Sequence, residues 1–328
     1  MTAPFVERWF RAHAGGAWSR FVIGTSGIFS QLWARYTFND VTIVNADALR
    51  AHVASGAPMI TVANHVSVLD DPVVLTLLGG GTPAPPRATR WTPATREIVF
   101  ASRARAAWFG AGQCIPIERD LGCPPGGLTQ PGLRACAERL MATGAGDHNR
   151  SRWVHIFPEG RICQKGLGRA WDGHERDYLR WGVGKVAAWA SLPSSPMLRV
   201  RESSTAPAPS STAPVIPPVI LPFYHLGMAA ALPLDRATNA SLRTVPRRTP
   251  QLLVKVGEPV AVDDLFEAFE NDGGGLAGRR WENDANARER ALYGAVAARA
   301  RGALAALARG CGADALEREH GGYDAAVD

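Results

Sequence analysis

The feature that most constrains the fold is an alternation of short β-rich runs with helical patterns from residue 40 onward. Apolar runs typical of buried strands occupy residues 41–44 (VTIV), 59–63 (MITVA), 113–117 (QCIPI), 153–157 (WVHIF), 219–223 (VILPF) and 252–256 (LLVKV). Helical patterns occupy residues 46–54, 72–78, 133–143, 179–191, 259–269 and 287–308. Strands that alternate with helices predict an α/β fold with a mostly parallel central sheet flanked by helices.

The length and composition fit one folded domain with two flanking segments. The chain has 328 residues, 46% of them hydrophobic and 20% charged, which is typical of a globular protein. We expect a single domain over residues 37–310, between an N-terminal segment (1–36) and a C-terminal tail (311–328). Within the domain, residues 201–214 (RESSTAPAPSSTAP) predict a flexible surface insertion, because they bury too little apolar area to offset the entropy cost of ordering.

Charge and cysteine content narrow the function. The net charge of +6 favours an anionic partner such as a phosphorylated substrate or a lipid surface, but no basic run or RNA-binding signature occurs, so we expect no nucleic-acid partner. The five cysteines are scattered and show no zinc-ligand spacing, so neither a disulfide framework nor a metal site is predicted. The longest uncharged apolar candidate for a membrane span, residues 215–234, contains four prolines that would break a helix.

The N-terminal segment is both basic and aromatic. Residues 1–36 combine Phe, Trp, Ile and Leu side chains with four arginines and one acidic residue, Glu7. Segments of this kind can lie in a lipid interface, with the rings at the level of the headgroups. The pattern also fits a helix packed on the domain or a transit-like segment, and the residues leave the three alternatives open.

The stretch NHVSVLDDP follows the predicted strand 59–63 directly. Asp71 and Pro72 form a good helix start, with Asp71 as the N-cap, so His65 and Asp70 are predicted to lie in the connection before that helix. A turn there can bring the Asp70 carboxylate onto one imidazole nitrogen and leave the other free to accept a proton, as a general base requires. The alternative is a capping aspartate beside a surface histidine.

Three further strand ends carry polar residues. In WVHIFPEGR the turn after the strand delivers Glu159, which is either a hydroxyl-binding group or a solvated turn residue, and Gly160 allows a close backbone approach. In GQCIPIER, Arg119 is either a phosphate ligand or a surface arginine. In the strand VILPF, Pro222 should end the strand or place it at an edge, and we expect His225 to be structural, like the strand residue His155.

Four blocks of the sequence together resemble a known group of enzymes. NHVSVLD, GQCIPIER, FPEGR and VILPFYH occur in the order of the four blocks of the glycerophospholipid acyltransferase superfamily. Within it, NHVSVLDDP, WVHIFPEG, RWGVGKV, LPFYHLGM and KVGEPV are similar to the mitochondrial phospholipid transacylases that remodel cardiolipin. The resemblance runs from Phe21 to Val260. The insertion at 201–214 and the tail after Cys311 depart from the family pattern.

The resemblance implies a glycerol-3-phosphate acyltransferase-like fold and a role for each motif residue. His65 would be the general base and Asp70 its orienting partner. Glu159 and Arg119 would hold the glycerol and phosphate of the acceptor, and Gly160 would shape the turn. The implied reaction moves a fatty acyl chain from a phospholipid to a lysophospholipid, with cardiolipin, monolysocardiolipin and phosphatidylcholine as substrates and with no cofactor.

A lipid substrate places the enzyme at a membrane. The resemblance implies peripheral or monotopic attachment to the inner or outer mitochondrial membrane, facing the intermembrane space, and it leaves a homo-oligomer open. The main alternative is an acyl-CoA-dependent 1-acylglycerol-3-phosphate acyltransferase that uses the same two residues. A silent lipid-binding protein is a further alternative, although a binder has little use for a poised base. Direct transfer is favoured over an acyl-enzyme, because no GxSxG motif is present and Ser67 is poorly spaced from His65.

Overall fold

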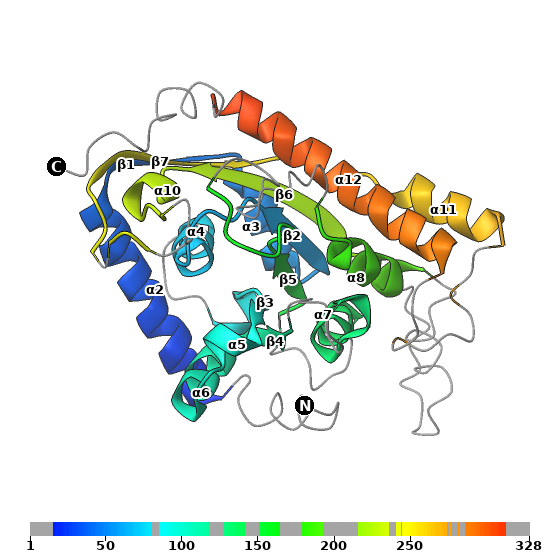
Figure 1. Ribbon diagram of the computed structural model, residues 1–328, viewed down its shortest axis with the longest axis horizontal. Helices are drawn as coiled ribbons and strands as arrows, with labels where there is room; N and C mark the ends of the chain where they lie inside the picture. Colours follow the sequence, from blue (N-terminus) through cyan, green and yellow to red (C-terminus); the bar gives the residue numbers. More distant parts are fainter. Residues whose placement is uncertain are drawn as a thin grey trace.

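The computed structural model describes residues 16–79, 85–118, 127–141, 151–164, 179–192, 216–235, 241–243, 245–273, 276, 281 and 286–312 (Figure 1). The predicted insertion at 201–214 lies outside the described residues. So do residues 1–15 of the predicted N-terminal segment and residues 313–328 of the predicted tail.

A five-stranded sheet forms the centre of the fold. Its strands are arranged in the order β1 (Phe38–Val44), β7 (Thr249–Val256), β6 (Val219–Leu226), β2 (Met59–Ala63) and β5 (Trp153–Ile156). The pairs β1–β7, β6–β2 and β2–β5 are parallel, and the pair β6–β7 is antiparallel. The predicted α/β fold with a mostly parallel sheet is therefore confirmed.

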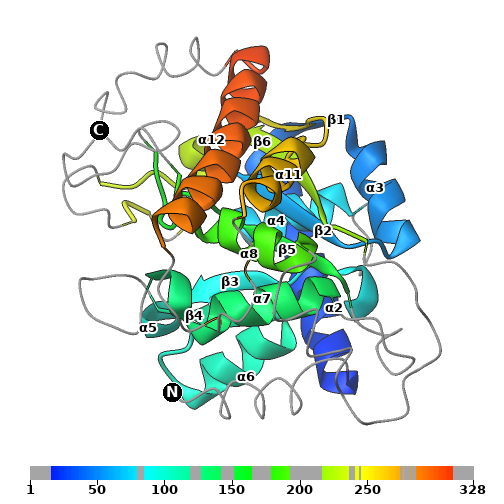
Figure 2. The ribbon, with the colours of Figure 1, turned by 90° about the vertical axis from the view of Figure 1, so that its right-hand side faces the viewer.

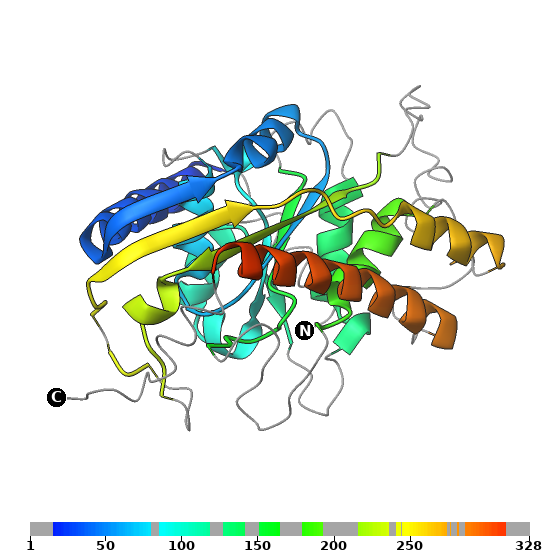
Figure 3. The same cartoon turned by 90° about the horizontal axis from the view of Figure 1, so that it is seen from above.

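Helices cover both faces of this sheet (Figures 1 and 2). On one face, Ile60 and Val62 of β2 pack with α7 (Pro131–Met141), α8 (Gly182–Ser191), α11 (Asp263–Asn271) and α12 (Ala287–Gly310). On the other face, Met59 and Ala63 pack with α2 (Ala17–Thr37), α3 (Ala46–Ser55) and α4 (Asp70–Leu78). Seen from above, α12 lies along β6 (Figure 3). Because β2 is buried on both faces, it reads as a continuous apolar run in the sequence.

A second, two-stranded parallel sheet was not predicted. It pairs β3 (Thr92–Thr95) with β4 (Cys114–Ile117), so the predicted strand 113–117 exists but belongs to this smaller sheet. The small sheet lies below the central one, with α5 (Arg96–Val99) and α6 (Arg103–Ala111) beside it (Figures 1 and 2). The sequence of β3, TPAT, is short and contains a proline, so it carries no strand signal.

The expectation that Pro222 ends a strand or lies at an edge is wrong. Strand β6 continues through Pro222 and lies between β7 and β2. The N–H and C=O of one strand residue point to the same side, and the Pro222 carbonyl accepts a hydrogen bond from Gly257 N (2.8 Å), beyond the end of β7. The missing N–H of Pro222 therefore points past the β6–β7 ladder and costs no strand hydrogen bond.

The N-terminal helix α2 has two contrasting faces. Val22, Ser30 and Ala34 lie on the face that packs against the domain, so this part of the predicted interfacial segment is also a packed helix. The opposite face exposes large apolar side chains at helical spacing, which we call the α2 apolar face: Trp18, Phe21, Ile28, Phe29, Leu32 and Tyr36. Among the helices that the structure describes, none combines the length and the hydropathy needed to cross a bilayer.

Candidate active site

His65 and Asp70 meet in the loop that joins β2 to α4. Asp70 is the first residue of α4, and its Oδ2 lies 3.0 Å from Nδ1 of His65. The same oxygen accepts hydrogen bonds from the backbone N–H groups of Val66 (2.6 Å) and Ser67 (2.8 Å). The β2–α4 loop (residues 64–69) therefore wraps around the carboxylate, which explains how side chains five positions apart come into contact.

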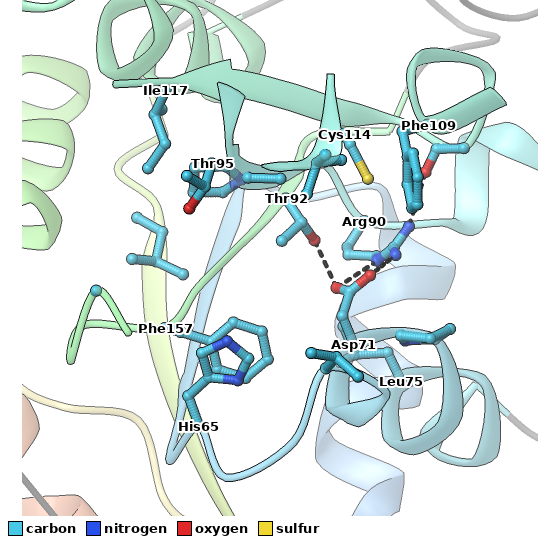
Figure 4. A pocket seen from close by; sticks show the side chains of 18 of the residues that line it. His65, Asp71, Leu75, Arg90, Thr92, Thr95, Phe109, Cys114, Ile117 and Phe157 are labelled. Atoms are coloured by element: carbon cyan, nitrogen blue, oxygen red, sulfur yellow. Dashed lines mark hydrogen bonds and ion pairs between the residues drawn. The ribbon is translucent and has the colours of Figure 1, made fainter. Parts of the chain in front are cut away.

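This contact fixes the tautomer of His65. A carboxylate oxygen that accepts from an imidazole requires the proton on Nδ1, so the lone pair lies on Nε2. The side chain of His65 is 20% exposed, whereas that of Asp70 is 1% exposed. The imidazole ring projects into a cavity (Figure 4). His65 is thus arranged as a base with one nitrogen held and the other facing the space where a substrate could bind.

The turn after β5 holds His65 from a second side. Glu159 is buried, and its Oε1 accepts a hydrogen bond from the backbone N–H of His65 (2.8 Å). The ring of Phe157 stacks on the His65 imidazole at a centroid distance of 4.0 Å and an interplanar angle of 15° (Figure 4). In the structure, the Glu159 carboxylate therefore contacts the backbone of His65, and its predicted contact with the acceptor's glycerol stays a prediction.

Gly160 shapes this turn as its sequence position suggested. Its φ is +69°, a conformation that L side chains rarely adopt, and its N–H donates to the Phe157 carbonyl (3.0 Å). A Cβ at this position would lie 2.5 Å from Cδ and Nε of Arg180. Gly160, Arg161 and Arg180 all line the cavity. The absence of a side chain at Gly160 thus allows Arg180 to pack against the turn that carries Glu159.

The cavity is large and mainly apolar. Its volume is about 1010 Å³, at the upper end of the roughly 300–1,000 Å³ typical of small-ligand pockets. It extends from His65 to α2 and to the small sheet. Apolar residues that line it include Val22, Ile23, Leu75, Val99, Trp108, Phe109, Ile117 and Leu133. A cavity of this size and lining suits a hydrocarbon chain next to the base.

The wall opposite His65 carries a polar cluster that the sequence did not reveal (Figure 4). Asp71 pairs with Arg90 through both carboxylate oxygens and accepts a hydrogen bond from Thr92 Oγ1 (2.7 Å). The predicted N-cap role of Asp71 is therefore wrong: α4 begins at Asp70, two residues before the predicted start at Pro72, and Asp71 ties this helix to β3 instead. The second aspartate of NHVSVLDDP was the available signal, but its partners Arg90 and Thr92 lie 19 and 21 positions further along the chain, and no local pattern pairs them with it.

Of the other residues considered in the sequence, three are buried away from the cavity and one lies outside the described residues. His155 and His225 are fully buried, as expected for structural histidines, and burial lowers the pKa of both, that of His155 well below its usual range. Ser67 is buried and its Oγ accepts a hydrogen bond from Leu69 N (3.2 Å), which is consistent with direct transfer. Arg119 lies outside the described residues, so its role as a phosphate ligand stays a prediction.

Comparison with known proteins places the chain in a class. The family model described as Acyltransferase matches residues 40–219, which is more than half of the chain and includes the loop with His65 and Asp70. The chain therefore belongs to the acyltransferase family, and it is an enzyme of the transferase class.

Individual relatives show which members of the family the chain resembles. The chain is 27% identical to the protein named taffazin in Dictyostelium discoideum, over 77% of this chain and 73% of the relative. It is 28% identical to the tafazzin of Drosophila melanogaster, over 76% of this chain and 53% of the relative. It is also 30% identical to an N-acylphosphatidylethanolamine synthase of Arabidopsis thaliana, over 76% of this chain and 73% of the relative. The similarity to tafazzins confirms the branch of the superfamily that the sequence motifs indicated.

Proposed function

We propose that this acyltransferase is a phospholipid–lysophospholipid transacylase that remodels cardiolipin without acyl-CoA. The observation that carries the proposal is the imidazole of His65, held by Asp70 at 3.0 Å and facing an apolar cavity of about 1010 Å³. The similarity to tafazzins supports the choice of phospholipid as donor and lysophospholipid as acceptor.

The chemistry follows from the arrangement of His65. Nε2 takes the proton of the lysophospholipid hydroxyl while that oxygen attacks the donor's ester carbonyl. The positive charge that develops on the imidazole is stabilised by the buried carboxylate of Asp70. When the tetrahedral intermediate collapses, the proton on Nε2 passes to the departing glycerol oxygen, so the base is regenerated. The apolar cavity keeps water away from the ester, which favours transfer over hydrolysis.

The assay for this proposal omits acyl-CoA. Purified protein is incubated with phosphatidylcholine labelled in its acyl chain and with lysocardiolipin, and labelled cardiolipin is measured. We expect transfer by the wild type and none by His65→Ala, whose binding to liposomes should be unchanged. Transfer from acyl-CoA but not from phosphatidylcholine would contradict the proposal and support the CoA-dependent alternative.

A second candidate function is suggested by the Arabidopsis relative, whose name describes synthesis of N-acylphosphatidylethanolamine. In that reaction the acceptor is the amine of phosphatidylethanolamine rather than a glycerol hydroxyl, and the same base could remove its proton. Adding phosphatidylethanolamine as a competing acceptor separates the two candidates. We expect labelled cardiolipin to exceed labelled N-acylphosphatidylethanolamine, and the opposite ratio would favour the second candidate.

We further propose that the α2 apolar face rests on the membrane of mitochondria. Its six large apolar side chains are each about half exposed, and the exposed Arg20 and Arg35 of the same helix can attract anionic headgroups. On its other side, α2 contributes Val22, Ile23 and Gly27 to the cavity wall. One helix therefore contacts both the bilayer and the substrate cavity, which gives lipid chains a short path to His65.

Membrane binding is tested by replacing Phe21, Phe29 and Leu32 together with serine. We expect this variant to bind cardiolipin-containing liposomes at least about tenfold more weakly in a flotation assay, because apolar area that enters the interface is lost. The matched control replaces three equally exposed apolar residues elsewhere: Ile216, Leu242 and Val245. Equal flotation of the two variants would place the membrane contact away from α2.

A further inference from the structure

We propose that Asn64 and His225 form a clasp that holds the β2–α4 loop, so that both are positioning residues for His65. The inference rests on the proposed function only where it concerns the rate of transfer. The hydrogen-bond geometry that supports it is independent of the substrate.

The Asn64–His225 clasp consists of three hydrogen bonds. Asn64 Nδ2 donates to the His225 carbonyl (3.0 Å), and the backbone N–H of His225 donates to Asn64 Oδ1 (3.0 Å). The His225 Nε2 donates in turn to the Asn64 carbonyl (3.0 Å). The side-chain amide of Asn64 therefore pairs with the backbone of His225 as a neighbouring strand would.

The position of the clasp explains its effect. The β2–β6 ladder ends with the pair Ala63 and Phe223, and the chain leaves the sheet at Asn64. The clasp adds one further link between the two chains, immediately before His65. It thereby determines where the loop departs from the sheet, and hence where the backbone of His65 meets Glu159 and where its ring meets Asp70.

Burial makes the clasp strong. Asn64 is 2% exposed and His225 is 1% exposed, so water cannot replace a broken bond, and a lost partner leaves a buried polar group unsatisfied. The two residues are 161 positions apart in the sequence, so the clasp ties the fourth sequence block to the first.

The clasp also keeps His225 from competing for Asp70. Because the Asn64 carbonyl can only accept, the proton of His225 lies on Nε2, and Nδ1 has no hydrogen-bond partner among the described residues. Nε2 is 3.8 Å from Asp70 Oδ2, beyond hydrogen-bond distance, whereas His65 Nδ1 is at 3.0 Å. Burial lowers the pKa of His225, which favours its neutral form. Asp70 Oδ2 therefore accepts a hydrogen bond from His65 and none from His225.

Two substitutions of His225 distinguish a role in positioning the β2–α4 loop from a general loss of stability. In His225→Gln the longer side chain can place an amide N–H near the original Nε2, whereas in His225→Asn the amide is too short to reach the Asn64 carbonyl. The control Trp189→Phe removes a different buried hydrogen bond, from Trp189 Nε1 to the Tyr293 hydroxyl (2.9 Å), which joins α8 to α12 away from the β2–α4 loop.

The first measurement is hydrogen–deuterium exchange of the peptide that spans residues 64–70. We expect exchange at least about tenfold faster in His225→Asn, and near wild-type rates in His225→Gln and Trp189→Phe. Should His225→Asn fail to fold, Asn64→Ser, which removes only the two side-chain bonds of Asn64, serves in its place. Unchanged exchange in the clasp variants, or equal acceleration in Trp189→Phe, would overturn the proposal.

The second measurement is the kinetics of acyl transfer. We expect kcat of His225→Asn to fall about 10²-fold with KM within a factor of two, because the base is displaced but the cavity is not. His225→Gln should stay within a factor of three. The double variant Asn64→Ser/His225→Asn should be no slower than the slower single variant, since both break one clasp. Multiplied losses, or equal losses in His225→Gln and His225→Asn, would contradict the clasp. A wild type without transfer would refute the proposed function, while the exchange experiment would still test the clasp.

Discussion

His65 and His225 approach the same oxygen of Asp70, yet they differ in their hydrogen bonds and in their exposure to the cavity. His65 Nδ1 is 3.0 Å from Oδ2, and its ring lines the cavity with a fifth of the side chain exposed. His225 Nε2 is 3.8 Å from the same atom, its side chain is fully buried, and it donates to a backbone carbonyl instead. Neither the residue type nor the proximity to a carboxylate therefore makes a base.

Two physical conditions account for the difference. A base needs one nitrogen held by an acceptor and the other open to substrate, and His65 meets both conditions. His225 meets only the first: its protonated nitrogen is held by the Asn64 carbonyl, but its other nitrogen is buried and faces no substrate cavity. The hydrogen bond with Asp70 makes His65 a base that faces the cavity, and the Asn64–His225 clasp holds the residue that precedes His65.

Among the residues that contact His65, the largest effect is expected for Asp70→Asn. An asparagine amide can donate to Nδ1 of His65, which would move the proton to Nε2 and remove the lone pair that faces the cavity. We expect kcat for acyl transfer to fall by about 10² to 10⁴. The measurement is the initial rate with labelled phosphatidylcholine, with the folded fraction determined by circular dichroism.

An unchanged rate in Asp70→Asn would contradict the distinction between His65 as a base and His225 as a positioning residue. In that case the carboxylate would be only a helix-terminal group that organises the loop through Val66 and Ser67. A loss of rate that tracks a loss of folded protein would lead to the same conclusion.

A smaller effect is expected for Glu159, and its kinetic form distinguishes two roles. Since Glu159 Oε1 accepts from the N–H of His65, we expect Glu159→Ala to lower kcat by roughly 10- to 100-fold with little change in KM. Glu159→Gln keeps an acceptor oxygen and should lose less than about fivefold. A rise in KM with kcat preserved would instead support the contact with the acceptor's glycerol that the sequence predicted.

The smallest effect concerns stability and pH. Burial lowers the pKa of His155 and His225, so each is neutral in the native state and binds a proton more readily when unfolded. The stability that each contributes is complete above an unfolded-state pKa of about 6.5 and is lost as the pH falls toward the native value, at up to about 1.4 kcal/mol per pH unit.

Urea unfolding of the wild type and of His225→Gln between pH 7.5 and pH 5 tests this expectation. We expect the free energy of unfolding to fall less steeply below pH 6.5 in the variant, because glutamine does not titrate. Parallel curves would show that His225 does not change its protonation on unfolding.

The fold was predictable where apolar runs are buried on both faces. Strand β2 occupies the predicted residues 59–63, since a central parallel strand needs a continuous apolar run. Strand β3 was missed because TPAT lacks that run, and α6 was missed because its sequence, RARAAWFGA, buries few residues. The prediction that Pro222 ends a strand or lies at an edge was wrong because a single sequence does not show that β7 ends before it reaches Pro222.

The site was predictable only where its members are close in sequence. The contact of His65 with Asp70 joins residues only five positions apart, in the loop and helix start that follow a strand. The contacts of His65 with Glu159 and of Asn64 with His225 join residues 94 and 161 positions apart, and nothing in the local pattern pairs them. The family resemblance brought the blocks together and assigned Glu159 to the substrate, which stays a prediction; it did not indicate the hydrogen bond from the backbone N–H of His65 to Glu159 Oε1.

The most direct test makes the same substitution at both histidines of the comparison. His65→Gln and His225→Gln each retain a hydrogen-bonding amide, but only the first removes the proposed base. The measurement is the initial rate of acyl transfer from labelled phosphatidylcholine to lysocardiolipin, without acyl-CoA. We predict a loss of at least about 10³-fold for His65→Gln and less than about threefold for His225→Gln. A His65→Gln enzyme that keeps its rate would contradict the assignment of His65 as the base.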